Sequence, residues 1–155
     1  MVFLTPALFM AQVFWGPQAA LPLMSATGMR GGVSGVAFLS FSEAFVAALP
    51  FGILFGCLLQ PPSLARAAFF AFLPSAAIFC FALSEGLTDR LWWIPLTDAL
   101  FFVALFSLFS LLGGAIRRAV PEMNYVYLGM GFLVLTVLYT FVPHLYLSHV
   151  YGNPV

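Results

Sequence analysis

Two carboxylates lie within stretches of sequence that are otherwise apolar. Glu43 falls inside the run 33–59, and Asp98 falls inside the run 92–116. An ionisable group at membrane depth costs roughly 2.5–3.5 kcal/mol on insertion scales, so it usually faces a partner or a water-filled cavity. Glu43 is therefore a candidate for binding a translocated proton or cation. The alternative is a structural carboxyl that hydrogen-bonds to a neighbouring helix.

Asp98 has two interpretations that the sequence leaves open. It follows Trp93 by five residues, which is about 7.5 Å along a helix. If Trp93 marks the membrane interface, Asp98 lies in a shallow part of the apolar zone and is a candidate for binding a solute or a proton. It could instead cap a helix that begins beside Thr97, since Thr and Asp both favour that position.

Pro50 lies in the same apolar run as Glu43, seven residues or about two helical turns further on. A proline inside a helix removes a backbone donor and leaves one carbonyl oxygen poorly satisfied. Broken helices of transporters use such carbonyls to hold ions or substrates, although proline is also frequent in membrane helices that only kink. The candidate translocation residues are thus Glu43, Pro50 and Asp98.

Small residues recur every four positions through the run 33–59. Side chains spaced by four lie along one face of a helix. In lipid no hydrophobic force brings helices together, so close backbone approach across small residues supplies the packing. This small-residue ridge predicts a tightly packed helix partner, within the chain or in another subunit. Its members are Ser40, Ala44, Ala48, Gly52 and Gly56.

The sequence predicts neither a metal centre nor a catalytic residue. His144 and His149 would point about 140° apart on a helix, and no acidic residue or cysteine is close in sequence to complete a ligand set. Cys57 and Cys80 lie in apolar runs and are interpreted as small buried side chains. No motif for nucleophilic catalysis is present. We therefore expect no cofactor and no enzymatic activity.

The elements that must position these residues are transmembrane helices. Of the 155 residues, 63% are apolar and 6% are charged, a composition that soluble domains do not have. A spanning helix needs about 20 mostly apolar residues. The sequence predicts a single transmembrane domain, 1–155, that is an all-α polytopic membrane bundle of four or five helices with short loops.

Four predicted spans are uninterrupted, and a fifth is broken by prolines. The four are 33–59, 67–86, 92–116 and 124–147. The fifth, 2–24, is predicted to be a kinked span, with a re-entrant segment or an interfacial helix as alternatives.

The arginines indicate an orientation for this bundle. With five spans, Arg66, Arg117 and Arg118 share one side with the N-terminus, whereas Arg30 and Arg90 lie on the other. Because cytoplasmic loops carry the excess of basic residues, three arginines against two predict an inside N-terminus and an outside C-terminus. The five basic and five acidic residues balance, so the chain has no basic patch for nucleic acid.

Two functions from different classes remain open. The first is a small integral membrane transporter, or an ion- or proton-translocating component, that acts at a helix–helix interface. The second is a non-catalytic subunit embedded in a larger respiratory or energy-converting membrane complex. The expected partners are the lipid bilayer and either other membrane subunits or further copies of the chain. The membrane would be a bacterial inner membrane or that of an organelle.

Overall fold

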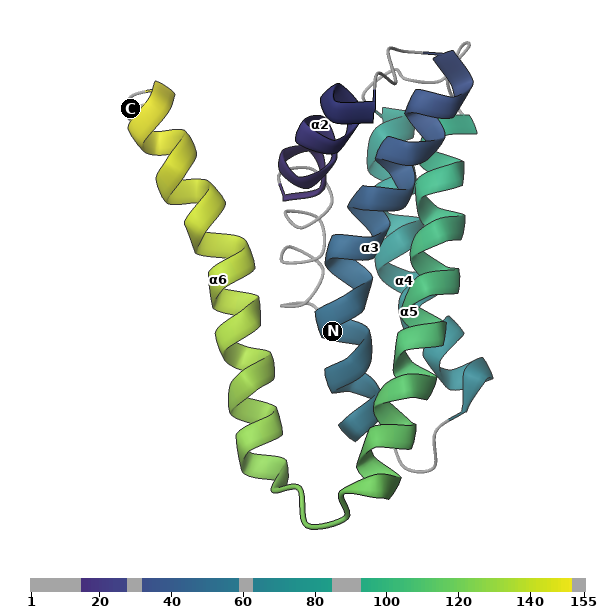
Figure 1. Cartoon of the computed structure of the whole chain (residues 1–155), viewed down its shortest axis with the longest axis vertical. Helices are drawn as coiled ribbons and strands as arrows, with labels where there is room; N and C mark the ends of the chain where they lie inside the picture. The colour runs from purple at the N-terminus through teal and green to yellow at the C-terminus, as the bar shows by residue number, and fades with distance from the viewer. Residues whose placement is uncertain (1–14, 28–31, 59–62, 85–92, 152–155) are drawn as a thin grey trace.

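The structure, a computed structural model, describes residues 15–27, 32–58, 63–84 and 93–151. These residues form helices joined by short connections, and they contain no strand. The all-α class predicted from the sequence is therefore confirmed. The helices are α2 (Gly16–Thr27), α3 (Gly32–Leu58), α4 (Leu64–Ser84), α5 (Trp93–Ala119) and α6 (Tyr125–Tyr151), as Figure 1 shows.

Three helices are long and apolar enough to cross a membrane. They comprise Ala37–Leu58 in α3, Trp93–Ala119 in α5 and Tyr125–Pro143 in α6. The predicted span 67–86 corresponds to α4, in which the apolar stretch Leu64–Ala77 is shorter than a full span. The described residues thus contain the helices of all four uninterrupted predicted spans, three of them with a full apolar length.

The described part of the predicted span 2–24 is α2. This helix has 12 residues and is roughly 18 Å long, shorter than a hydrocarbon core of about 30 Å. It contains Pro22 and packs beside the first half of α3 (Figure 1). Residues 2–14 lie outside the described residues, so the prediction of a kinked span stays a prediction.

The helices α3, α4 and α5 form the packed part of the molecule. The most extensive contact is between α3 and α5, which run in the same direction while α4 returns between them in sequence (Figure 1). Phe51, Phe102 and Phe106 are fully buried or nearly so at this contact. Because small alanines lie beside these rings, the helix axes can approach closely. The alanines are Ala44, Ala47, Ala48 and Ala71.

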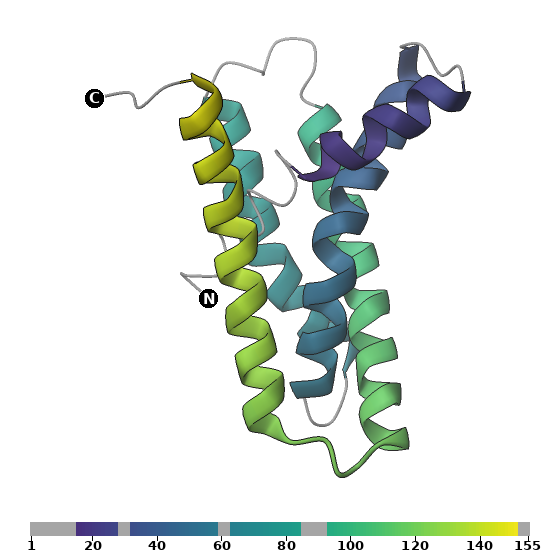
Figure 2. The ribbon, with the colours of Figure 1, turned by 60° about the vertical axis from the view of Figure 1, so that its left-hand side comes forward.

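The helix α6 stands apart from this core along most of its length (Figures 1 and 2). None of the residues 125–142 is buried within the structure, whereas Pro143, at the end of the apolar span, is fully buried. Large apolar side chains on it, such as Tyr127 and Leu133, are more than half exposed. In a membrane these side chains meet lipid or a partner protein.

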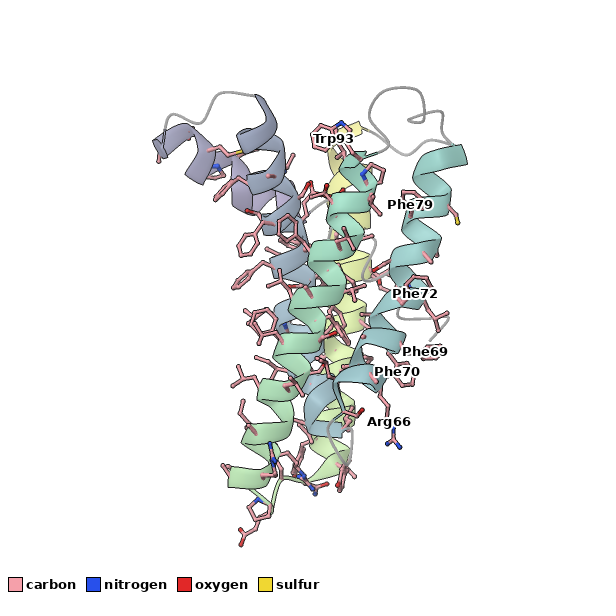
Figure 3. All side chains as sticks on the ribbon, turned by 90° about the vertical axis from the view of Figure 1, so that its right-hand side faces the viewer. Arg66, Phe69, Phe70, Phe72, Phe79 and Trp93 are labelled. Atoms are coloured by element: carbon pink, nitrogen blue, oxygen red, sulfur yellow. The ribbon has the colours of Figure 1, made fainter. Side chains whose placement is uncertain are left out.

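Aromatic and basic residues mark the two ends of the bundle. Trp93 begins α5 at one end, and Arg66 lies near the other end, on α4 (Figure 3). The 27 residues of α5 extend about 40 Å, close to the thickness of a bilayer with its headgroups. At the far end of α5, the guanidinium of Arg117 donates to the carbonyl of Met123 and lies 4.2 Å from the centre of the Tyr125 ring. Arg117 thereby fixes the turn between α5 and α6.

Candidate functional site

The small-residue ridge lies on the face of α3 that contacts α5. Ser40, Ala44 and Ala48 are each at most 2% exposed. A Cβ added to Gly52 would lie 2.9 Å from the Cβ of Phe109. The structure therefore places the ridge where α3 needs a partner, and the partner is a helix of the same chain.

Glycines bring the two backbones into direct contact near the C-terminal ends of α3 and α5. A Cβ on Gly56 would overlap the carbonyl of Ser110, and a Cβ on Gly113 of α5 would overlap the carbonyl of Ile53. The thiol of Cys57 donates to the carbonyl of Gly113 across the same contact, at 3.3 Å. These backbone contacts fix the register of α3 against α5. The register in turn decides which residues meet nearer the N-terminal ends of the two helices.

Of the two cysteines, only Cys57 has the buried position expected from the sequence. Cys80 is exposed on α4, so the prediction was wrong for this residue. The physical reason is that α4 packs against α5 along one side and leaves the opposite side uncovered, where Phe69 and Phe72 are also exposed (Figure 3). An apolar run does not distinguish a side chain that faces protein from one that faces lipid.

Glu43 and Asp98 lie at the α3–α5 contact, in the N-terminal halves of the two helices. Both side chains are half-buried, and they lie close enough to interact electrostatically. Glu43 lies roughly 16 Å along α3 from Gly32, whereas Asp98 lies about 7.5 Å along α5 from Trp93. The register of the two parallel helices thus joins two candidates that the sequence presented separately.

Ser40 completes this group. Its side chain is 2% exposed and lies within hydrogen-bonding reach of the Asp98 carboxylate. The Oδ1 atom of Asp98 is buried and accepts no hydrogen bond from the described residues. One ridge member therefore supplies a hydroxyl to the carboxylate pair, and one carboxylate oxygen has unused capacity to accept a proton or contact a cation.

Asp98 does not cap a helix. The helix α5 begins at Trp93, so Asp98 lies in its second turn rather than at its first residue. Pro95 falls in the first turn, where a missing backbone donor costs nothing. Thr97 donates its hydroxyl back to the carbonyl of Trp93, at 2.7 Å. The capping interpretation was wrong because the hydrophobic segment continues through Pro95 in helical form.

No basic side chain balances the two carboxylates within the described part of the chain. Arg66 lies toward the end of the molecule opposite Trp93 (Figure 3), and Arg117 and Arg118 lie in the last turn of α5, which begins at Trp93. Two negative charges in a low-dielectric environment repel each other strongly, so a bound proton or cation lowers the energy of such a pair. The chemistry that the arrangement can perform is reversible binding of a small positive charge.

Pro50 frees a carbonyl oxygen that has a hydrogen-bond donor within the chain. The carbonyl oxygen four residues before it, that of Val46, lacks its helical donor. In the structure this oxygen accepts a hydrogen bond from the Tyr139 hydroxyl of α6, at 3.2 Å. Sequence reasoning missed Tyr139, because nothing in the pattern of α6 indicates that its hydroxyl reaches α3.

Within the described residues, no group of three or more His, Cys, Asp and Glu side chains could hold a metal ion. The side chains of His144 and His149 lie outside those that the structure describes. The oxygen atoms of Ser40, Glu43 and Asp98 lie together at the α3–α5 contact, with two carboxylates among them.

No family model, curated protein or solved structure matches this chain. The basis for a function is therefore the contact of α3 with α5. What distinguishes that contact chemically is a pair of carboxylates without a basic partner among the described residues.

Proposed function

We propose that this chain is a small integral membrane transporter or translocating component that moves protons or another small cation. The carboxylate pair of Glu43 and Asp98 is its binding site, at the interface of α3 and α5. The observation that carries this proposal is the electrostatic interaction of two half-buried carboxylates without a basic partner among the described residues. Ionisable groups at membrane depth are costly, and they are retained mainly where they bind or relay charge.

The positions of the two groups support a path rather than an isolated site. Asp98 lies nearer the end of the bundle marked by Trp93, and Glu43 lies deeper along α3. A positive charge that enters from that end meets Asp98 first and Glu43 second. Ser40, next to Asp98, supplies a hydroxyl that can donate or accept along this path.

The first test is the substitution Glu43→Gln in purified protein reconstituted into liposomes. We expect the variant to fold and assemble, because the amide keeps the size and hydrogen-bonding capacity of the carboxyl, but to lose proton or cation flux. The flux is measured with an internal pH-sensitive dye under an imposed potential, and folding is measured by thermal unfolding in detergent. Glu122→Gln is the matched control, since Glu122 is an exposed carboxylate in the α5–α6 turn.

A Glu43→Gln protein that is stable and fully active would refute the role of Glu43 in translocation. In that case Glu43 is a structural carboxyl. Glu43→Ala should then destabilise the protein by about 1–3 kcal/mol, because the polar partner of the carboxyl is left unsatisfied.

The second candidate function is a non-catalytic subunit of a larger membrane complex, and α6 favours it. None of the residues 125–142 of α6 is buried within the chain, so most of one helix face is available to a partner subunit. Purification in mild detergent with native mass measurement separates the two functions. Fixed co-purifying subunits support the complex, whereas an isolated chain or homo-oligomer that conducts in liposomes supports the transporter. In either case we expect a bacterial inner membrane or an organelle membrane.

A further inference from the structure

The helix α6 contacts the rest of the described chain through a small aromatic cluster. The ring of Phe51 on α3 packs edge-on against Phe132, at 5.6 Å between centroids, and against Tyr139, at 5.3 Å. The ring of Tyr139 also lies 6.0 Å from that of Trp15. In lipid such apolar contacts gain little over contacts with acyl chains, so packing and polar contacts decide whether α6 stays docked.

One polar contact joins α6 to α3, and it meets a specific need of α3. Because Pro50 has no backbone N–H, the carbonyl oxygen of Val46 has no donor within its own helix. In the apolar core of a membrane no water can satisfy such a carbonyl, so it needs a donor from the protein. The hydroxyl of Tyr139 supplies the missing donor at 3.2 Å. The proline on one helix and the tyrosine on the other therefore depend on each other.

We propose that the Tyr139–Val46 hydrogen bond is a releasable latch that holds α6 against α3, and that Pro50 creates the acceptor for it. The helix α6 then has two arrangements, one latched and one swung away from α3. Because Pro143 is the buried residue among the described side chains of α6 and none of residues 125–142 is buried, few buried contacts oppose the second arrangement, as expected for an element of low local stability. Val46 follows Glu43 by about one turn, so the latch lies about one turn along α3 from the carboxylate pair. The proposal does not depend on what that pair binds.

A double-mutant cycle in thermal stability tests the mutual dependence. Tyr139→Phe keeps the ring and removes only the hydroxyl, and we expect the Tm in detergent to fall by about 2–4 °C. Pro50→Ala restores an N–H at position 50, which then satisfies the Val46 carbonyl inside α3. In the Pro50→Ala background, Tyr139→Phe should therefore leave the Tm unchanged. Tyr127→Phe is the matched control, because Tyr127 lies on the same helix and is 73% exposed.

A distance measurement tests the release of α6. Spin labels at Leu108 on α5 and Leu138 on α6 occupy exposed positions, in a background that carries Cys80→Ser. We expect one narrow distance distribution for the unaltered latch, and a broader and longer one for Tyr139→Phe and for Pro50→Ala. The proposal is overturned if Tyr139→Phe behaves like Tyr127→Phe in both measurements, or if its Tm decrease is the same with Ala at position 50.

Discussion

The energy of a carboxylate inside an apolar helix changes when a second carboxylate interacts with it. A single buried carboxyl can be stabilised by one hydrogen bond from a neighbouring helix, whereas two that interact repel each other when both are ionised, and a bound proton or cation relieves that repulsion. Glu43 and Asp98 belong to the second case, with Ser40 as the nearby hydroxyl. The energetic signature of this arrangement is coupling between the two positions, which is measurable without knowing the transported ion.

At this scale we predict that Glu43→Gln and Asp98→Asn are not additive. Removal of either charge ends the repulsion, so the second substitution has nothing further to relieve. The effects of the two single substitutions on the free energy of unfolding should sum to more stabilisation than the double variant shows, by about 0.5–3 kcal/mol. The coupling should be larger at alkaline than at acid pH, because deprotonation increases the repulsion. Additive effects at both pH values would mean that the carboxyls do not interact.

The individual carboxylates could be found from the sequence, but their meeting could not. Glu43 and Asp98 stand out because each interrupts an apolar run. Which residues they face depends on the register of α3 against α5, which is fixed by backbone contacts at Gly56 and Gly113. The partnership of Tyr139 with Val46 was hidden for the same reason, since it is decided by how α6 lies on α3.

Two glycines on different helices have opposite roles in packing. Gly56 lies against the backbone of α5 with no room for a Cβ, whereas an added Cβ at Gly129 on α6 meets nothing within 4 Å. Of these two glycines, only Gly56 must lack a side chain for the helices to pack. At Gly129 a glycine merely lowers helix propensity.

We predict that Gly56→Ala destabilises the protein and Gly129→Ala does not. Overpacking at Gly56 should cost about 1–3 kcal/mol, because the added methyl group meets the carbonyl of Ser110. Gly129→Ala should raise the free energy of unfolding by up to about 1 kcal/mol, since alanine favours a helix. Reversible unfolding in detergent measures both. Equal effects of the two substitutions would contradict the packing of α3 on α5.

The helices α3, α5 and α6 could be predicted from their long apolar runs, because about twenty apolar residues in lipid form a helix whatever their order. Proline-broken segments were harder. In α2 the described helix covers only part of the predicted span, and apolarity does not decide whether such a piece crosses the membrane or lies along it. The exposure of side chains could not be predicted either, as Cys80 shows, because apolar residues suit contact with both protein and lipid.

At the scale of the whole molecule, the described arginines share one end. Arg66 begins α4, and Arg117 and Arg118 end α5, so the alternation of helix directions brings all three to one side of a membrane (Figure 3). The positive-inside rule predicts that this end is cytoplasmic. We then expect α6 to carry the chain to the opposite side.

We predict that a label at Glu122 is reached from the inside and a label at position 152 from the outside. Single cysteines at these positions, in a background lacking Cys57 and Cys80, react with a membrane-impermeant maleimide. We expect position 152 to react in intact cells, and Glu122→Cys to react only after permeabilisation. Reaction of both from the same side would show that α6 does not cross the membrane.

The parallel contact of α3 with α5 has a consequence for biogenesis. Because α4 separates them in the chain, α3 leaves the ribosome and enters the bilayer before its closest partner has been synthesised. During that interval Glu43 and the glycine face of α3 have no α5 to meet, so they must be shielded by the insertion machinery or by water at its lateral opening. Completion of α5 both ends that exposure and brings Asp98 to Glu43, so the pair that we propose as a charge-binding site forms only once α5 is in place.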